Sequence, residues 1–339
     1  MPTDACLVTV VIPIFNSAST LWRAAASALR QAAVPLEVLI VDDGSRDSSP
    51  AEAFRIGALD DRVRVIALPE NRGKPHAMNL AIAEARGTWI AVLDADDWYA
   101  PDRVAVLLTA AERNGVELVA DNQYFHDAGA GQVVRTAFPA SRQGGPMTRR
   151  DFIAGSDPFA EFNFGMLKPM IHAGFVRRTG LRYREKARLG EDFLYLVEFF
   201  AAGGSAFLVS RPLYYWTQAF GGRSRRWTTT GDGPWRYDFQ SARTANAEVR
   251  EALRTSTNDD LITLLDRRDR ALGQLHALRE LRRSRDAGCG PARLIGSLSR
   301  HPSLWPIVLR RALHAASRRI MAHRAPSEAP HVRVDDAVT

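Results

Sequence analysis

The chain has 339 residues, of which 46% are apolar and 24% charged, with 45 Lys and Arg against 38 Asp and Glu. This length and composition allow one large or two ordinary globular domains and exclude a wholly disordered chain. Two cysteines, Cys6 and Cys289, cannot build a disulfide framework, and no apolar run of 18 residues marks a membrane-spanning helix.

Short strand-like and helix-like segments alternate over the first 120 residues. Apolar, β-rich runs predict strands at Leu7–Phe15, Leu36–Val41, Val63–Leu68, Thr88–Leu93 and Val116–Ala120. Between them the sequence predicts helices at Ser17–Gln31, from a capping box at Ser49–Glu52, at Pro75–Ala85 and at Pro101–Asn114. Repeated βα units of this length predict an α/β fold, with a mostly parallel sheet and helices on both faces.

The pattern weakens beyond residue 120. Gly and Pro interrupt residues 121–168, which favours loops over a cleft. A helix is predicted at Phe193–Ala202, and the Gly-, Arg- and Trp-rich stretch Tyr214–Arg236 predicts a loop. The stretch Trp235–Arg285 is typical of two polar helices broken near residues 256–258.

The net charge of +7 is concentrated near the C-terminus. Between Asp286 and Glu328 there is no acidic residue, and seven arginines equal the whole net charge: Arg293, Arg300, Arg310, Arg311, Arg318, Arg319 and Arg324. The first 286 residues carry only +2, which argues against a nucleic-acid binder. Residues 303–324, plotted as a helix, have an apolar face with Trp305 and a basic opposite face. They fit either an interfacial anchor on anionic lipid or an ordinary packed helix, and we favour the anchor.

Acidic residues follow the fourth predicted strand. Ligands of parallel α/β sheets bind at the carboxyl ends of the strands, where Asp94 and Asp96 stand one residue apart. Two carboxylates so placed can converge on Mg²⁺ or Mn²⁺, which prefer oxygen ligands and take the rest from substrate phosphates. The spacing alone also fits a loop, because Asp clusters are common in turns.

Four motifs follow one another in the first third of the chain: Val10–Asn16, Val41–Ser45, Glu70–Lys74 with Asn79, and Asp94–Asp97. In order and spacing they resemble the nucleotide-sugar domain of inverting family 2 glycosyltransferases. The segments Leu167–Met170 and Gly190–Asp192 extend the resemblance over roughly the first 215 residues and are similar to bacterial exopolysaccharide (succinoglycan-type) glucosyltransferases. The resemblance implies a GT-A fold, a UDP-sugar donor and Mn²⁺ or Mg²⁺ as cofactor.

The site residues that the resemblance implies fall into three groups. The nucleotide-sugar site comprises Pro13, Phe15, Asn16, Asp43, Lys74, Asp94 and Asp96. Within it, Asp43 matches the acid that contacts uracil, and Asp96 and Asp94 match the metal ligands. Asp192 matches the general base, with Glu191 as the alternative. The candidates for contacting the acceptor or covering the diphosphate are Lys168, Trp216, Arg223 and Arg225.

Two departures from the family pattern refine this expectation. Met78 stands where many relatives have Arg, so we expect Lys74 to supply the basic contact. Arg223 stands at the Gln position of the Gln-x-x-Arg-Trp signature of processive members, so we expect one sugar transferred per acceptor. The expected reaction passes a hexose, with glucose as the first expectation, to a saccharide or polyprenyl-linked oligosaccharide acceptor in exopolysaccharide biosynthesis. Single in-line displacement would give a β-linked product.

Three other functions compete with this one. A haloacid-dehalogenase-type phosphatase also uses Asp-x-Asp, but on its first strand and with Thr or Val where Trp98 stands here. A dinucleotide-dependent oxidoreductase lacks support because no G-x-G-x-x-G follows the first strand. A catalytically degenerate sugar-binding or scaffold protein at the membrane stays open.

The expected organisation has three parts. They are a GT-A domain over residues 1–215, with a nucleotide-sugar half (1–120) and an acceptor half (121–215), a loop and helical extension over 216–286, and a basic segment and tail over 287–339. Because Asp4 precedes the first apolar run, we expect no signal peptide and a cytoplasmic protein. The basic segment would place it peripherally on the inner face of the cytoplasmic membrane.

Overall fold

The computed structural model describes residues 7–31, 33–139, 143–157, 162–187, 189–218, 239–254 and 258–286. Backbone proximity divides the chain into a unit of residues 1–275 and a second unit of residues 276–339. The sheet and the candidate site belong to the first unit. In the second unit, the described residues 276–286 are the last turns of helix α10 (Asp259–Asp286). The three-part organisation expected from the sequence stays a prediction.

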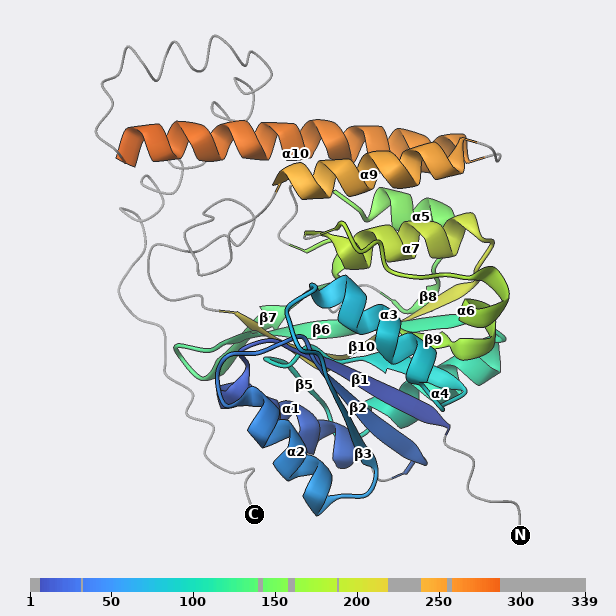
Figure 1. Cartoon of the computed structure of the whole chain (residues 1–339). Helices are drawn as coiled ribbons and strands as arrows, with labels where there is room; N and C mark the ends of the chain where they lie inside the picture. Colours follow the sequence, from blue (N-terminus) through green and yellow to red (C-terminus); the bar gives the residue numbers. More distant parts are fainter. Residues whose placement is uncertain are drawn as a thin grey trace, which may run out of the picture. The chain divides into compact units, whose positions relative to one another are not determined.

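Four parallel strands form the first half of the sheet, in the order β3-β2-β1-β4, of which Figure 1 labels the first three. Their bounds are β1 Val8–Ile14, β2 Leu36–Asp42, β3 Val63–Ala67 and β4 Trp89–Val92. Strand β2 is buried along its whole length, as expected for an apolar run covered on both faces. These strands and the helices between them lie close to their predicted positions.

The second half of the sheet is mixed. Strand β9 (Met170–His172) lies antiparallel between β4 and β6 (Leu118–Asp127), and β6 runs parallel to β10 (Ala206–Gln218). The short strands β5 (Trp98–Tyr99) and β8 (Gly145–Pro146) pair with β10, and β7 (Gln132–Thr136) pairs with β6, all antiparallel. The α/β fold with helices on both faces is confirmed, but only the first half of the sheet is wholly parallel.

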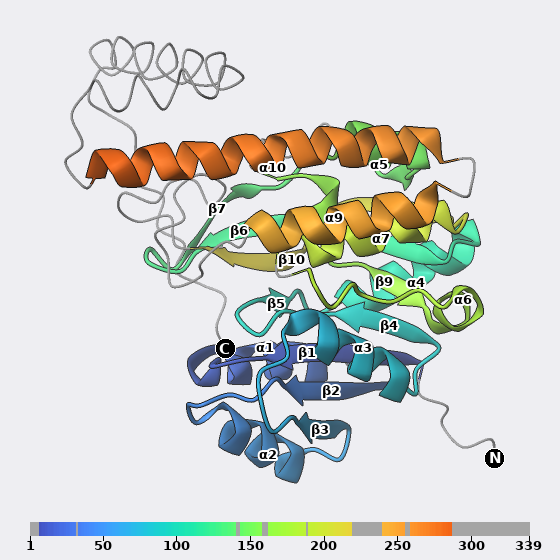
Figure 2. The ribbon, with the colours of Figure 1, turned by 45° about the horizontal axis from the view of Figure 1, so that its top comes forward.

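Two helical layers cover the sheet (Figure 2). Helices α1 (Ala18–Leu29), α2 (Ser49–Leu59) and α4 (Arg103–Asn114) share one apolar core with one face of the sheet. The opposite core takes residues from α3 (Lys74–Glu84), α5 (Arg149–Ala154), α6 (Ala173–Thr179), α7 (Glu191–Ala201), α9 (Phe239–Leu253) and α10. This second core joins Val11 on the first strand to Leu265 on the last described helix.

Three local predictions are corrected by the structure. The expected capping box at Ser49–Glu52 does not form: α2 has Ser48 as its N-cap without a side-chain hydrogen bond, while the Ser49 hydroxyl donates to Asp47 (2.5 Å). Residues 121–127, expected as loop, continue β6, and Tyr214–Gln218 continue β10. Strand β10 therefore runs through residue 215, where the sequence placed a domain boundary.

The C-terminal helices meet the expectation from the sequence. Helix α9 ends at Leu253 and α10 begins at Asp259, on either side of the predicted break. On α10, Leu261, Leu265, Leu272 and Leu275 are buried. Among the helices that the structure describes, none combines the length and the apolar character of a membrane span. The predicted basic helix at 303–324 lies outside the described residues.

Candidate active site

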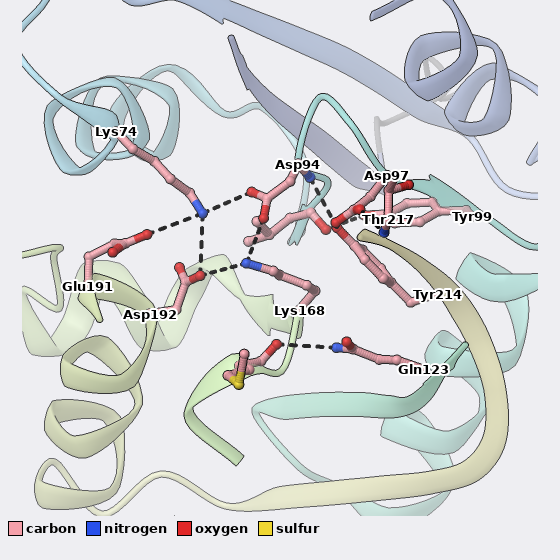
Figure 3. A network of polar contacts seen from close by, with 12 residues as sticks. Lys74, Asp94, Asp97, Tyr99, Gln123, Lys168, Glu191, Asp192, Tyr214 and Thr217 are labelled. Atoms are coloured by element: carbon pink, nitrogen blue, oxygen red, sulfur yellow. Dashed lines mark hydrogen bonds and ion pairs between the residues drawn. The ribbon is translucent and has the colours of Figure 1, made fainter. Parts of the chain in front are cut away.

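The site lies where β4, α3, the segment before β9 and the start of α7 come together (Figure 3). Asp94 follows β4 and the buried Leu93, and its backbone N–H donates to the Tyr214 hydroxyl (3.2 Å). Lys74 is the first residue of α3, directly after Gly73, whose φ of 96° belongs to the region that favours glycine. Glu191 and Asp192 form the first turn of α7.

Two lysines join the carboxylate of Asp94 to that of Asp192 (Figure 3). Lys74 Nζ lies 2.8 Å from Asp94 Oδ1, and Lys168 Nζ lies 2.7 Å from Asp94 Oδ2. Both ammonium groups also reach Asp192 Oδ2, at 2.6 Å from Lys168 and 3.3 Å from Lys74. Lys74 further contacts Glu191 Oε1 at 3.4 Å. We call Lys74, Asp94, Lys168 and Asp192 the charge ring.

The two oxygens of Asp192 have different surroundings. Oδ2 accepts from both lysines, whereas Oδ1 is buried and has no hydrogen-bond partner among the described residues. A buried carboxylate oxygen without a partner is unusual, because desolvation then goes uncompensated. Oδ1 is therefore an acceptor that has no partner in the part of the chain that the structure describes.

The alternating charges set the protonation states of the ring. Burial disfavours ionisation of Asp94 and Asp192, but Lys168 and Lys74 outweigh it and hold the pKa of both carboxyl groups below the usual range. Burial likewise opposes the lysine charges, yet the carboxylates raise the pKa of both ammonium groups. At neutral pH the ring carries two positive and two negative charges.

Glu191 differs from its neighbour. Burial and the adjacent Asp192 charge raise the pKa of Glu191, against the opposing effect of Lys74. A carboxylate with a raised pKa takes up a proton more readily, so Glu191 stays open as the alternative base.

Asp96 and Asp97, the two acids that follow Asp94, have different surroundings. Asp97 is buried and accepts from the Tyr214 hydroxyl (2.6 Å) and the Thr217 N–H (2.7 Å), which ties this loop to β10. Asp96 is exposed and pairs directly with no cation among the described residues. Crowding by surrounding protein and the charge of Asp94 raise the pKa of Asp96.

Asp94 and Asp96 offer carboxylate oxygens, the ligand type that Mg²⁺ and Mn²⁺ prefer. Within the described ranges, no group of three or more His, Cys, Asp and Glu is placed to hold a metal ion. Mg²⁺ and Mn²⁺ are commonly held by one or two carboxylates together with substrate phosphates. The exposed carboxylate of Asp96 fits this pattern. The carboxylate of Asp94 would fit it if the ion replaced one of the two lysine ammonium groups that bind Asp94.

The residues expected around the uracil stand at the carboxyl ends of β1 and β2, on the same edge of the parallel sheet as Asp94. The Asp43 carboxylate is buried and accepts from the N–H groups of Arg72 and Gly73 (both 2.7 Å) and from Asn71 Nδ2 (2.9 Å). Asn16, with φ of 52°, accepts from the Arg46 N–H (2.8 Å). Asp43 thus shapes the loop that leads into Lys74.

Of the remaining predicted site residues, the structure describes some and not others. Pro13 and Phe15 are half-buried near the end of β1. Trp216 is half-buried on β10 and packs against Phe125, with ring centroids 4.9 Å apart. Arg223 and Arg225 lie outside the described residues. The structure therefore brings Lys74, Asp94, Lys168 and Asp192 together, and the grouping of the others stays a prediction.

Sequence reasoning missed two supports of the site. Arg103 on α4 is fully buried, binds Asp121 Oδ1 (2.7 Å) and donates to the Lys168 carbonyl (2.5 Å). Arg268 on α10 is buried beside Gly190. Neither arginine stands in a motif. The available signal was its helical spacing, three or four residues from buried apolar residues such as Leu107 for Arg103 and Leu265 and Leu272 for Arg268.

Known proteins are similar in sequence to part of this chain. Residues 9–172 match the family model described as Glycosyl transferase family 2. Succinoglycan biosynthesis protein ExoO of Rhizobium meliloti (strain 1021) is 38% identical over 208 residues, covering 58% of this chain and 56% of ExoO. ExoU of the same organism is 37% identical over 202 residues, covering 57% and 55%. The chain thus spans little more than half the length of these curated relatives.

Solved structures share the fold. S. aureus TarS 1-349 in complex with UDP-GlcNAc matches with a TM-score of 0.58 and 14% identity, over 82% of this chain and 72% of that one. The mannosyltransferase PcManGT from Pyrobaculum calidifontis, in complex with GDP-Man and Mn²⁺, matches with a TM-score of 0.53 and 20% identity, over 88% and 79%. These likenesses confirm the GT-A fold that the motifs implied.

Proposed function

We propose that this chain, whose residues 9–172 form a family 2 glycosyl transferase domain, transfers a single hexose from a UDP-sugar to a saccharide or lipid-linked oligosaccharide. Transfer inverts the anomeric centre and gives a β-glycosidic bond. The names of ExoO and ExoU support a role in exopolysaccharide biosynthesis, and glucose is the first donor sugar to test.

One observation carries the proposal: Asp192 Oδ1 is buried, has no partner among the described residues, and belongs to the same charge ring as Asp94. The lysines bind Oδ2, which keeps the carboxylate ionised and fixes its orientation. Oδ1 is then free to accept the proton of an acceptor hydroxyl. A phosphatase of the haloacid-dehalogenase type would carry its Asp-x-Asp motif on the first strand, whereas Asp94 follows β4.

The proposed reaction is a single displacement. The acceptor hydroxyl oxygen forms a bond to the anomeric carbon while the bond from that carbon to the β-phosphate oxygen breaks. The hydroxyl proton passes to Asp192, and the electron pair of the broken bond leaves with UDP. A positioned carboxylate accelerates such a step by about 10²–10⁴-fold, because the attacking oxygen loses its proton as it attacks.

Lys74 and Lys168 act on the donor side. Both ammonium groups bind Asp94 in the absence of substrate, and a diphosphate offers them the same kind of anionic oxygen. A divalent ion held by Asp96 and Asp94, Mn²⁺ or Mg²⁺, would add positive charge beside the leaving diphosphate. Trp216, half-buried at the end of β10, is the proposed stacking surface for an acceptor sugar.

The donor claim is tested by calorimetry and thermal shift with UDP-, GDP- and CDP-sugars, each with and without Mn²⁺. We expect a UDP-sugar to raise the melting temperature and the metal to increase that effect. If no nucleotide sugar binds under either condition, the central claim is wrong, and the scaffold alternative takes its place.

The base is tested by replacing one carboxylate at a time. Asp192→Asn should abolish turnover and leave UDP affinity unchanged, because the amide accepts no proton and keeps nearly the same shape. Glu191→Gln is the matched comparison on the same turn and should retain turnover. Loss of both turnover and UDP binding in Asp192→Asn would make Asp192 a binding residue instead.

A further inference from the structure

Arg268 is a buried cation on α10, outside the segment that matches the family model. Its side chain is only 6% exposed. Nη1 donates to Asn246 Oδ1 on α9 (3.1 Å), and Asn246 in turn donates to the Leu265 carbonyl (2.9 Å). The guanidinium carbon lies 4.5 Å from the centroid of the Phe193 ring, on α7. One side chain therefore connects all three helices.

The guanidinium also lies against the turn that begins α7. A Cβ atom built on Gly190 would stand 2.0 Å from Arg268 Nη2, and Gly190 has a φ of 73°. Only glycine allows both this backbone conformation and this approach. The residues that follow directly are Glu191 and Asp192. The guanidinium of Arg268 thus packs against the backbone turn from which the carboxylates of Glu191 and Asp192 project.

The position is costly for an arginine. Among the described residues no carboxylate lies within ion-pair distance of Arg268, and the start of a helix disfavours a cation. Burial lowers the pKa of Arg268 to about 10, while the charge of Glu191 acts in the opposite direction. An apolar side chain would fill the same space without that cost, so packing alone does not account for the arginine.

We infer that Arg268 is a positioning residue, through which the helical extension holds the Gly190–Asp192 turn in its reactive place. The inference rests on the proposed function, because it assigns a role for that same site. It extends the catalytic apparatus to α10, a helix that lies outside the matched residues 9–172 and that the family motifs do not include.

The test uses the full chain and follows UDP release from the UDP-sugar that binds, with water as the acceptor. Arg268→Met should lower kcat on the order of tenfold to a hundredfold, the range seen when reacting groups are displaced by about 1 Å. The donor KM and the UDP affinity should stay within about twofold, and Arg268→Lys should recover part of the loss. Arg270→Met and Arg270→Lys are the matched controls, since Arg270 is exposed on the same helix.

Each other outcome is decisive. A kcat in Arg268→Met equal to that in Arg270→Met overturns the inference, as does a loss confined to donor KM. If Arg268→Met does not fold, Arg268→Lys decides: a kcat reduced at unchanged UDP affinity supports the inference, and one equal to Arg270→Lys overturns it. A wild-type protein that neither binds UDP nor turns over overturns the proposed function, and this inference with it.

Discussion

Lys168 is the residue on which the charge state of the proposed base depends most. Its ammonium lies 2.6 Å from Asp192 Oδ2 and is largely buried. Of the groups that act on Asp192, burial raises its pKa, while Lys168 first and Lys74 second lower it. Removing Lys168 leaves burial and the charge of Asp94 opposed by Lys74 alone.

Lys168→Met should therefore move the acidic limb of the kcat profile to higher pH. A raised pKa of Asp192 means that the carboxylate is protonated, and inactive as a base, over more of the acidic range. The measurement is kcat at saturating donor between pH 4 and pH 9. Lys186→Met is the matched control, because Lys186 binds Glu248 on the surface (2.6 Å) and should leave the profile unchanged. An unshifted limb in Lys168→Met would contradict this account of the ring.

The residues of the ring were predictable individually, but their pairing was not. Asp94, Asp192 and Lys74 stand in motifs, and each was expected at a ligand-binding position. That Lys168 bridges Asp94 and Asp192 depends on three chain segments meeting in space, for which spacing gives no signal. Asp43 shows the same limit. Its motif indicated a residue of the nucleotide-sugar site, and only the fold shows that its carboxylate accepts hydrogen bonds from the loop before Lys74.

At the scale of elements, Arg103 connects α4 to two neighbours at once. It binds Asp121 on β6 and donates to the Lys168 carbonyl in the segment before β9. Both side chains of the Arg103–Asp121 pair are buried, at 0% and 1% exposure. Removing one partner of such a buried pair strongly destabilises the protein, because the other charge then stays buried without compensation.

Arg103→Met should cost about 3–5 kcal/mol of unfolding free energy, measured by equilibrium urea denaturation. The control is Arg211→Met, whose ion pair with Asp102 is exposed on both sides and should cost less than about 1 kcal/mol. Equal losses in the two variants would show that burial does not decide the contribution of the Arg103 pair.

The elements that the sequence located well are those with one dominant signal. The apolar strands β1 to β4 and the helices between them follow from periodicity and from Gly and Pro at their ends. Strand β10 was not predicted at all: Arg211 and Pro212 interrupt its apolar pattern, and the ladder has register shifts there. The cap of α2 was misplaced because the Ser49 hydroxyl binds Asp47 instead of the helix end.

At the scale of the whole chain, the basic segment beyond residue 286 is a sequence prediction that still requires a test. Liposomes of anionic lipid should float the full chain but not a chain ending at Asp286, because the seven arginines lie beyond that point. Neutral liposomes are the control and should float neither. Equal flotation of the two chains on anionic lipid would contradict the anchor and favour a packed helix.

The larger apolar core has a consequence for how this protein is made. It joins Val11 of the first strand to Leu261 and Leu265 of the last described helix, so its contacts span nearly the whole described sequence. While the chain emerges from the ribosome, residues 9–172 are complete long before the helices that close this core. The nascent family domain therefore exposes apolar surface until α10 arrives, and chaperone contact during synthesis should end only when that helix docks.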